Sequence, residues 1–147
     1  MSILIHVSTI ITDAKHRILF VREAKPIHHG LWNLSGGHVE IGEHPTNAAV
    51  REVFEETSLE VVLESLVGIY SGISPRIQSI RFVFKAASYA GLPSAGDEIL
   101  EVKWMSAEEV LQKSDSELVG SGILRAVIRD WQAGLSYPLE VLSNSEE

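Results

Sequence analysis

Three glutamates lie close together in the segment REVFEET, residues 51–57. In a helix, Glu52, Glu55 and Glu56 occupy positions i, i+3 and i+4, so their carboxylates share one face. Like charges at this spacing repel one another by roughly 0.2–0.5 kcal/mol per pair. Carboxylate oxygens are ligands for hard cations such as Mg²⁺ or Mn²⁺, and a bound cation would offset the repulsion. The spacing therefore predicts a divalent-cation site, with a solvated acidic helix face as the alternative.

Other residues at fixed spacing surround this segment. Glu43 follows Gly37 after six positions, Arg51 directly precedes the first glutamate, and the aliphatic Leu59 follows the last. The pattern resembles the Nudix box, the loop–helix–loop signature of the Nudix hydrolases, over residues 37–59. Such a set of identities rarely arises by chance. The resemblance extends to LWNLSGG before the box and to EILEVKWMSAEEV after it.

Two positions depart from the family pattern. Ser58 stands where the family has a glycine after the paired glutamates, and Ser35 stands where a proline often precedes the two glycines. The glycine ends the helix, and we expect Ser58 to adopt the same left-handed conformation at a cost of about 1 kcal/mol. Neither change removes a metal ligand.

The resemblance assigns roles to the box residues. It implies that Glu52, Glu55 and Glu56 are metal ligands and that the carbonyl of Gly37 is a further one. It also places Glu52 and Glu55 among the catalytic residues, together with Arg51, which we expect to orient Glu55 through an i,i+4 pair. For Glu43 we expect support of the loop and of the metal ligands, with simple surface solvation as the alternative.

A later glutamate is a candidate for catalysis. Glu98 lies six residues before Trp104, where some Nudix enzymes supply a loop glutamate as metal ligand or general base. The neighbouring residues Asp97 and Glu101 are alternative candidates for the same role. The general base could equally be a glutamate of the box, because bound metals would set its pKa.

Histidines and one tryptophan flank the box. No pair among His28, His29, His38 and His44 has the HExxH spacing of zinc enzymes, so we expect solvated loop positions or contacts to the substrate. Trp32 could stack on a nucleobase, but its apolar neighbours favour a place in the core.

The elements that position these residues follow from the hydrophobic pattern. Residues 3–12 and 17–23 predict two strands joined as a hairpin, and residues 30–45 predict a loop. Pro45 suits the first turn of a helix over residues 45–57. We expect this helix to dock through the face opposite the carboxylates, which carries Thr46, Val50, Val53, Phe54 and Thr57.

The remaining elements complete a mixed fold. We predict strands at residues 61–73, 77–89 and 98–105, a short helix opened by a Ser106–Glu109 capping box, a last helix that ends at Gly134, and a frayed tail after Tyr137. Strands mixed with three helices indicate the α/β (α+β) class. We expect a Nudix-like α/β/α sandwich with a mixed β-sheet, as a single domain over residues 1–147.

Composition limits the classes of function. The formal net charge of −8 argues against general nucleic-acid binding, which needs a basic surface. The absence of cysteine excludes disulfides, thiolate zinc sites and thiol nucleophiles. The apolar start, MSILIHVSTIIT, is too short to span a membrane. We therefore expect a cytoplasmic protein that binds a small phosphorylated substrate; its oligomeric state stays open.

The resemblance implies a reaction. Nudix hydrolases cleave phosphoanhydride bonds in nucleoside diphosphate derivatives with Mg²⁺, which Mn²⁺ can replace, by attack of metal-activated water on phosphorus. The segments IRFVFKA and GLSYPLEVL look like a bacterial branch that acts on nucleoside tri- and diphosphates and on hydroxymethylpyrimidine pyrophosphate. The alternative is a non-catalytic ligand-sensing module, although every acidic position of the box is filled. Isopentenyl diphosphate isomerase, a related enzyme, relies on a cysteine that this chain lacks.

Overall fold

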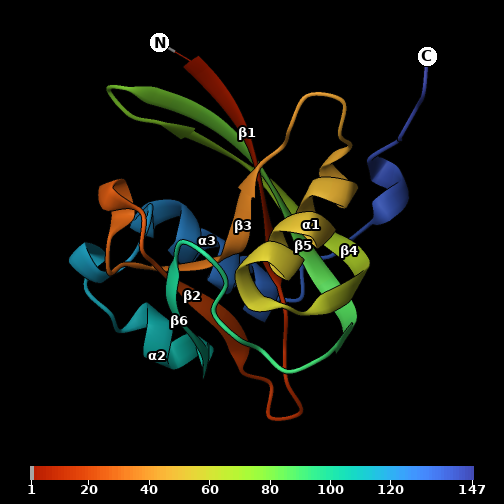
Figure 1. The fold of residues 1–147 in the computed structure, drawn as a ribbon. Coiled ribbons are helices and arrows are strands. Elements are labelled where there is room, and N and C mark those ends of the chain that lie inside the picture. The colour runs from red at the N-terminus through yellow and green to blue at the C-terminus, as the bar shows by residue number, and fades with distance from the viewer. Residues whose placement is uncertain (1) are drawn as a thin grey trace.

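A mixed seven-stranded sheet forms the centre of the molecule (Figure 1). The computed structural model describes residues 2–147. The strands are β1 (Ser2–Ile10), β2 (Ile18–Glu23), β3 (Trp32–His38), β4 (Glu60–Ile73), β5 (Ile77–Ala90), β6 (Ile99–Met105) and β7 (Tyr137–Pro138). The helices are α1 (Pro45–Thr57), α2 (Ala107–Leu111) and α3 (Ser121–Gln132), with short 3₁₀ turns η1 (Pro26–His28), η2 (Asp115–Glu117) and η3 (Leu139–Val141). The strand order is β6-β2-β3-β1-β5-β4-β7, and only β1 and β5 are parallel.

Helices cover both faces of the sheet, which confirms the predicted sandwich (Figure 1). Alternate residues of β1 point to opposite faces. Val7 packs against Ala48 and Ala49 of α1, whereas Ile10 belongs to the core that includes Leu124 of α3. The central strand therefore connects two separate hydrophobic layers, and α1 is held close to one of them.

The predicted hairpin of the first two strands is wrong. β3 lies between β1 and β2. Within residues 2–147 the two predicted segments bond to each other only near their turn, through the Thr12–Ile18 bridge and the Asp13–Arg17 and Leu19–Ile11 backbone hydrogen bonds. The predicted loop at residues 30–45 is also wrong in its first half, because β3 spans Trp32–His38. Its two glycines weaken local strand propensity, but β1 and β2 supply backbone partners on both sides of β3. Because β3 was predicted as a loop, β1 and β2 were predicted to be adjacent in the sheet.

Helix α1 has the predicted bounds but a different buried face. Its buried residues are Ala48, Ala49, Val53, Glu56 and Thr57. Val50 and Phe54, which were expected in the core, are 38% and 54% exposed. The two small alanines let the helix approach β1 closely, and this rotation turns Glu56 into the protein.

Several later predictions are confirmed. The strands predicted at residues 61–73 and 77–89 are present as β4 and β5, Ser106 and Glu109 form the capping box of α2, and Gly134 follows α3 with a φ of 79°. The tail is not frayed directly after Tyr137. β7 pairs with β4, and Leu139 and Leu142 pack against the α1 side of the sheet.

Ser58 ends α1 in the predicted left-handed conformation, with φ 66° and ψ 5°. We expect Ser58→Gly to raise the free energy of unfolding by up to about 1 kcal/mol, because glycine adopts this conformation without steric strain. Ser58→Ala is the matched control, since it keeps the strained Cβ and removes only the exposed hydrogen bond to Ser94. Urea unfolding of the three proteins measures the difference, and a glycine variant no more stable than wild type would contradict the expected strain.

Candidate active site

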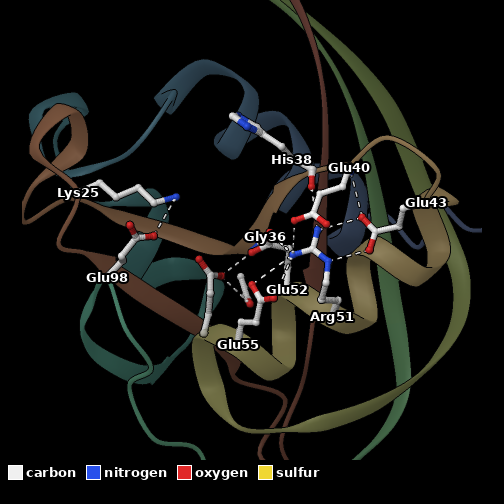
Figure 2. A network of polar contacts seen from close by, with 11 residues as sticks. Lys25, Gly36, His38, Glu40, Glu43, Arg51, Glu52, Glu55 and Glu98 are labelled. Carbon is white, nitrogen blue, oxygen red and sulfur yellow. Dashed lines mark hydrogen bonds and ion pairs between the residues drawn. The ribbon is translucent and has the colours of Figure 1, made fainter.

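Arg51 joins the loop after β3 to the acidic face of α1 (Figure 2). Its guanidinium donates to the carboxylates of Glu43 at 2.7 Å, Glu52 at 2.9 Å and Glu55 at 3.2 Å, and to the carbonyl of His38 at 3.1 Å. The predicted i,i+4 pair with Glu55 is therefore present, and Glu43 supports the loop by pairing with Arg51 and accepting from the Glu40 amide at 3.1 Å. The hydrogen bond from Arg51 lowers the pKa of Glu43.

Glu56 is the most deeply buried carboxylate of the site. Its side chain is 7% exposed and accepts hydrogen bonds from the Ser35 hydroxyl at 2.9 Å and the Gly36 amide at 2.8 Å. Burial raises the pKa of Glu56 to about 8 in the metal-free protein, and the charge of Glu23 adds to the effect. The two hydrogen bonds oppose the shift. The expectation that all three helix carboxylates lie on a free face is thus wrong for Glu56.

Glu52 lies against the backbone of β3. A Cβ atom added to Gly37 would stand 2.5 Å from the Glu52 carboxylate, so a side chain at this position would displace that carboxylate. Burial raises the pKa of Glu52, and its pair with Arg51 opposes that shift. The structure therefore brings Gly37 and Glu52 into direct proximity, with Glu56 one helical turn further along.

The segment before β6 closes over the end of α1. The Gly96 amide donates to the Glu56 carbonyl at 2.9 Å, and a Cβ at Gly96 would lie 1.9 Å from the Glu55 carbonyl oxygen. Glu98 has a φ of 67°, an uncommon value for a residue other than glycine. Its carboxylate lies 3.6 Å from the ammonium of Lys25, on the other side of the site from Arg51 (Figure 2).

The predicted ligands do not converge into a ready coordination shell. Within residues 2–147, no three carboxylates or imidazoles are grouped closely enough to hold a metal ion. The Glu52 and Glu55 carboxylates turn toward Arg51, and that of Glu56 turns toward Ser35. The donors nevertheless fit a hard cation, because all are oxygens and two of the carboxylates are desolvated without full compensation.

Comparison with known proteins settles the family. The family model of the NUDIX domain matches residues 3–125. The chain belongs to the Nudix family. The phosphatase NudJ of Escherichia coli (strain K12) is 32% identical over 117 residues, which cover 78% of this chain and 74% of NudJ. As a Nudix hydrolase the chain is an enzyme, and its family acts on phosphoanhydride-type substrates.

Solved Nudix structures share the whole architecture. A NUDIX hydrolase from Nitrosomonas europaea has a TM-score of 0.81 and 26% identity, and the match covers 98% of both chains. The NUDIX domain of Shewanella oneidensis NrtR, solved in complex with ADP ribose, has a TM-score of 0.73 and 18% identity, covering 90% of both chains. Nudix hydrolases generally use divalent metals, commonly Mg²⁺. No helix among the described residues is long and apolar enough to cross a membrane.

One buried carboxylate of this Nudix fold was missed in the sequence. Glu23 ends β2, is 5% exposed, and is among the charges that raise the pKa of Glu56. Burial raises the pKa of Glu23 as well. The four apolar residues at positions 18–21 of the same strand are all fully buried, so an acidic residue at the end of a strand buried on both faces was a usable signal.

The tryptophan and the histidines that flank the box lie in different surroundings. Trp32 is 9% exposed and packs in the α3-side core, as favoured from its neighbours. His38 ends β3 instead of lying in a loop, and its ring meets that of His6 with centroids 4.5 Å apart. Burial lowers the pKa of His28 in the turn before β3, and the charge of Arg81 adds to this effect.

Proposed function

We propose that this Nudix hydrolase cleaves phosphoanhydride bonds of nucleoside tri- or diphosphates, or of a small organic pyrophosphate, in a reaction that depends on Mg²⁺ or on Mn²⁺ in its place. Gly37, Glu52, Glu55 and Glu56 would hold the cation. The observation that carries the proposal is the pair of desolvated carboxylates, Glu52 and Glu56, whose pKa values burial raises because no cationic group compensates them fully. A bound cation would remove this electrostatic cost.

The residues of the chain have separate tasks in this proposal. A bound cation would neutralise charge at the phosphoryl oxygens and lower the pKa of water. Arg51 holds Glu52 and Glu55 in place and, through Glu43, fixes the loop that leads into α1. For the general base the candidates are a box glutamate and Glu98, whose unusual backbone conformation is typical of a constrained functional residue.

The proposed substrate class draws on the relatives. The curated relative is named a phosphatase, and a Nudix domain of the same fold binds ADP ribose, itself a nucleoside diphosphate derivative. The proposal also includes a single catalytic domain over residues 1–147 and a cytoplasmic location.

Metal dependence is the first test. We expect hydrolysis to stop in excess chelator and to return with Mg²⁺ or Mn²⁺ but not with Zn²⁺, because the proposed ligands are all hard oxygens. The assay is phosphate release, with products identified, on nucleoside tri- and diphosphates, nucleotide sugars, dinucleoside polyphosphates and hydroxymethylpyrimidine pyrophosphate. Full turnover in chelator would overturn the metal assignment. Saturable binding of these compounds without turnover of any would instead support a sensing module.

A further inference from the structure

Three neighbouring strands carry a row of basic side chains outside the carboxylate cluster. His38 of β3 is paired with His6 of β1, and His6 is paired with Arg81 of β5. Side chains of directly paired residues project from the same face of a sheet. The next row on that face consists of Gly36, Ser8 and Val83, and Val83 belongs to the α3-side core. The basic row therefore lies at the margin of this core.

Arg81 lacks the partners that a desolvated guanidinium requires. Its Nε atom is buried without a hydrogen-bond partner, and the only hydrogen bond of its side chain within residues 2–147 is a long one of 3.5 Å to the Ser8 hydroxyl. No ion pair in this part of the chain includes it. Burial lowers the pKa of Arg81, and the charge of Glu23 only opposes that shift. A desolvated charge without a close partner costs free energy, and an anionic ligand bound at Arg81 would offset this cost.

The surroundings of Arg81 are also basic and incompletely bonded. The Nε2 atom of His6 is buried without a partner, and its ring touches that of His38. Burial, followed by the charge of Arg81, lowers the pKa of His6 to about 4. Lys25 and His28 contribute further positive character around His6. The row thus combines unused hydrogen-bonding capacity with a positive potential.

The row lies beside the carboxylate site. Ser8, which Arg81 contacts, is paired with Gly36, and the Gly36 amide donates to Glu56. The two places face opposite sides of the sheet, since the row borders the α3-side core and Glu56 belongs to α1. They meet at the edge of β3, because β3 pairs with β2 only over residues 32–34 and leaves the Gly36 amide free to donate to Glu56. The charge of Lys25 contributes to the pKa of both His6 and Glu52, so both places lie near this side chain. Figure 2 shows the ring of His38 pointing away from Arg51. A polyphosphate chain that crosses the edge of β3 at Gly36 would extend from one place to the other.

We propose that Arg81, flanked by His6 and His38, binds a third phosphoryl group of the substrate, beyond the two phosphoryl groups held at the carboxylate site. The inference rests on the proposed function. The guanidinium fork would donate two parallel hydrogen bonds to phosphoryl oxygens, and the added negative charge would compensate the desolvated cation. Among the proposed substrates, this subsite favours a nucleoside triphosphate over the diphosphate of the same nucleoside.

Phosphate binding without metal tests the subsite independently of catalysis. Inorganic phosphate is titrated in excess chelator while the imidazole signals of His6 and His38 are followed by NMR. We expect saturable shifts in the wild type and at least roughly tenfold weaker binding by Arg81→Gln. Arg76→Gln is the matched control, because Arg76 is exposed in the turn before β5 and makes no ion pair within residues 2–147. Equal binding by wild type and Arg81→Gln overturns the proposal.

Kinetics and melting temperature separate recognition from a structural role. With Mg²⁺, we expect Arg81→Gln to raise KM for a nucleoside triphosphate roughly 10- to 100-fold and KM for the matching diphosphate much less, with little change in kcat. Arg81→Lys should recover part of the loss, and the melting temperature of Arg81→Gln should equal or exceed that of wild type. An equal rise in KM for both substrates overturns the subsite. A wild type that hydrolyses neither substrate refutes the proposed function alone, because the phosphate titration still decides the subsite.

Discussion

Glu56→Gln should make the metal-free protein more stable and at the same time remove most of its hydrolytic activity. At neutral pH the wild-type side chain must stay protonated or carry a buried charge, because burial raises its pKa to about 8. Glutamine has no such cost and can still accept the hydrogen bond from the Gly36 amide. We expect a gain on the order of 3 kcal/mol at pH 7, well above the 0.2–0.5 kcal/mol of repulsion per pair along a helix. Activity should fall because a charged ligand is lost.

The stability difference should depend on pH. Because the folded-state pKa of Glu56 is raised, its contribution to wild-type stability is fully present below the unfolded value of 4.5 and is lost as the pH rises through about 8. The wild-type and Glu56→Gln curves should therefore coincide near pH 4.5 and separate toward pH 8. Urea unfolding in chelator across this range measures the effect. Glu60→Gln is the control, because the Glu60 residue is exposed at the start of β4. A separation that does not grow with pH would contradict the role of burial.

Arg51→Gln should both destabilise the fold and slow hydrolysis. The substitution leaves the carboxylates of Glu43, Glu52 and Glu55 without their shared cation, and the first two are each only 16% exposed. We expect a loss of about 2–4 kcal/mol in unfolding free energy and a roughly 10- to 100-fold fall in kcat, because Arg51 orients the proposed ligands. Arg51→Lys should recover little, since lysine cannot donate to several carboxylates in the planar geometry of arginine.

Arg125→Gln provides the control for this experiment. Arg125 also binds the backbone through its guanidinium, donating to the carbonyls of Leu111 and Lys113. It lies on α3, which packs on the face of the sheet opposite α1. Its loss should lower stability without changing kcat at a temperature where the variant is folded. Chemical unfolding and steady-state hydrolysis are measured on all three variants. If Arg51→Gln matched Arg125→Gln in kcat, Arg51 would hold only the fold.

Short-range residue patterns were sufficient to predict several elements of the structure from the sequence. The i, i+3 and i+4 spacing of the glutamates, Pro45 at the first turn and the residue after the paired glutamates defined α1 and its end, and the structure confirms these bounds. The pair of Arg51 with Glu55 also followed from helical spacing alone. The strands β4 and β5 were predictable from their local strand pattern and from the turn between them, and the capping box of α2 from residues three positions apart.

Contacts between distant segments decided the rest. The glycines of β3 carry too little local strand signal, so its place between β1 and β2 depends on backbone partners that the sequence does not reveal. The depth of Glu56 depends on how α1 turns against β1, which Ala48 and Ala49 allow through their small size. Helical spacing could place three carboxylates on one helix, but it could not show that one of them is buried. Nor could it show that Arg81 lies in a row with two histidines, because that row exists only through the pairing of three strands.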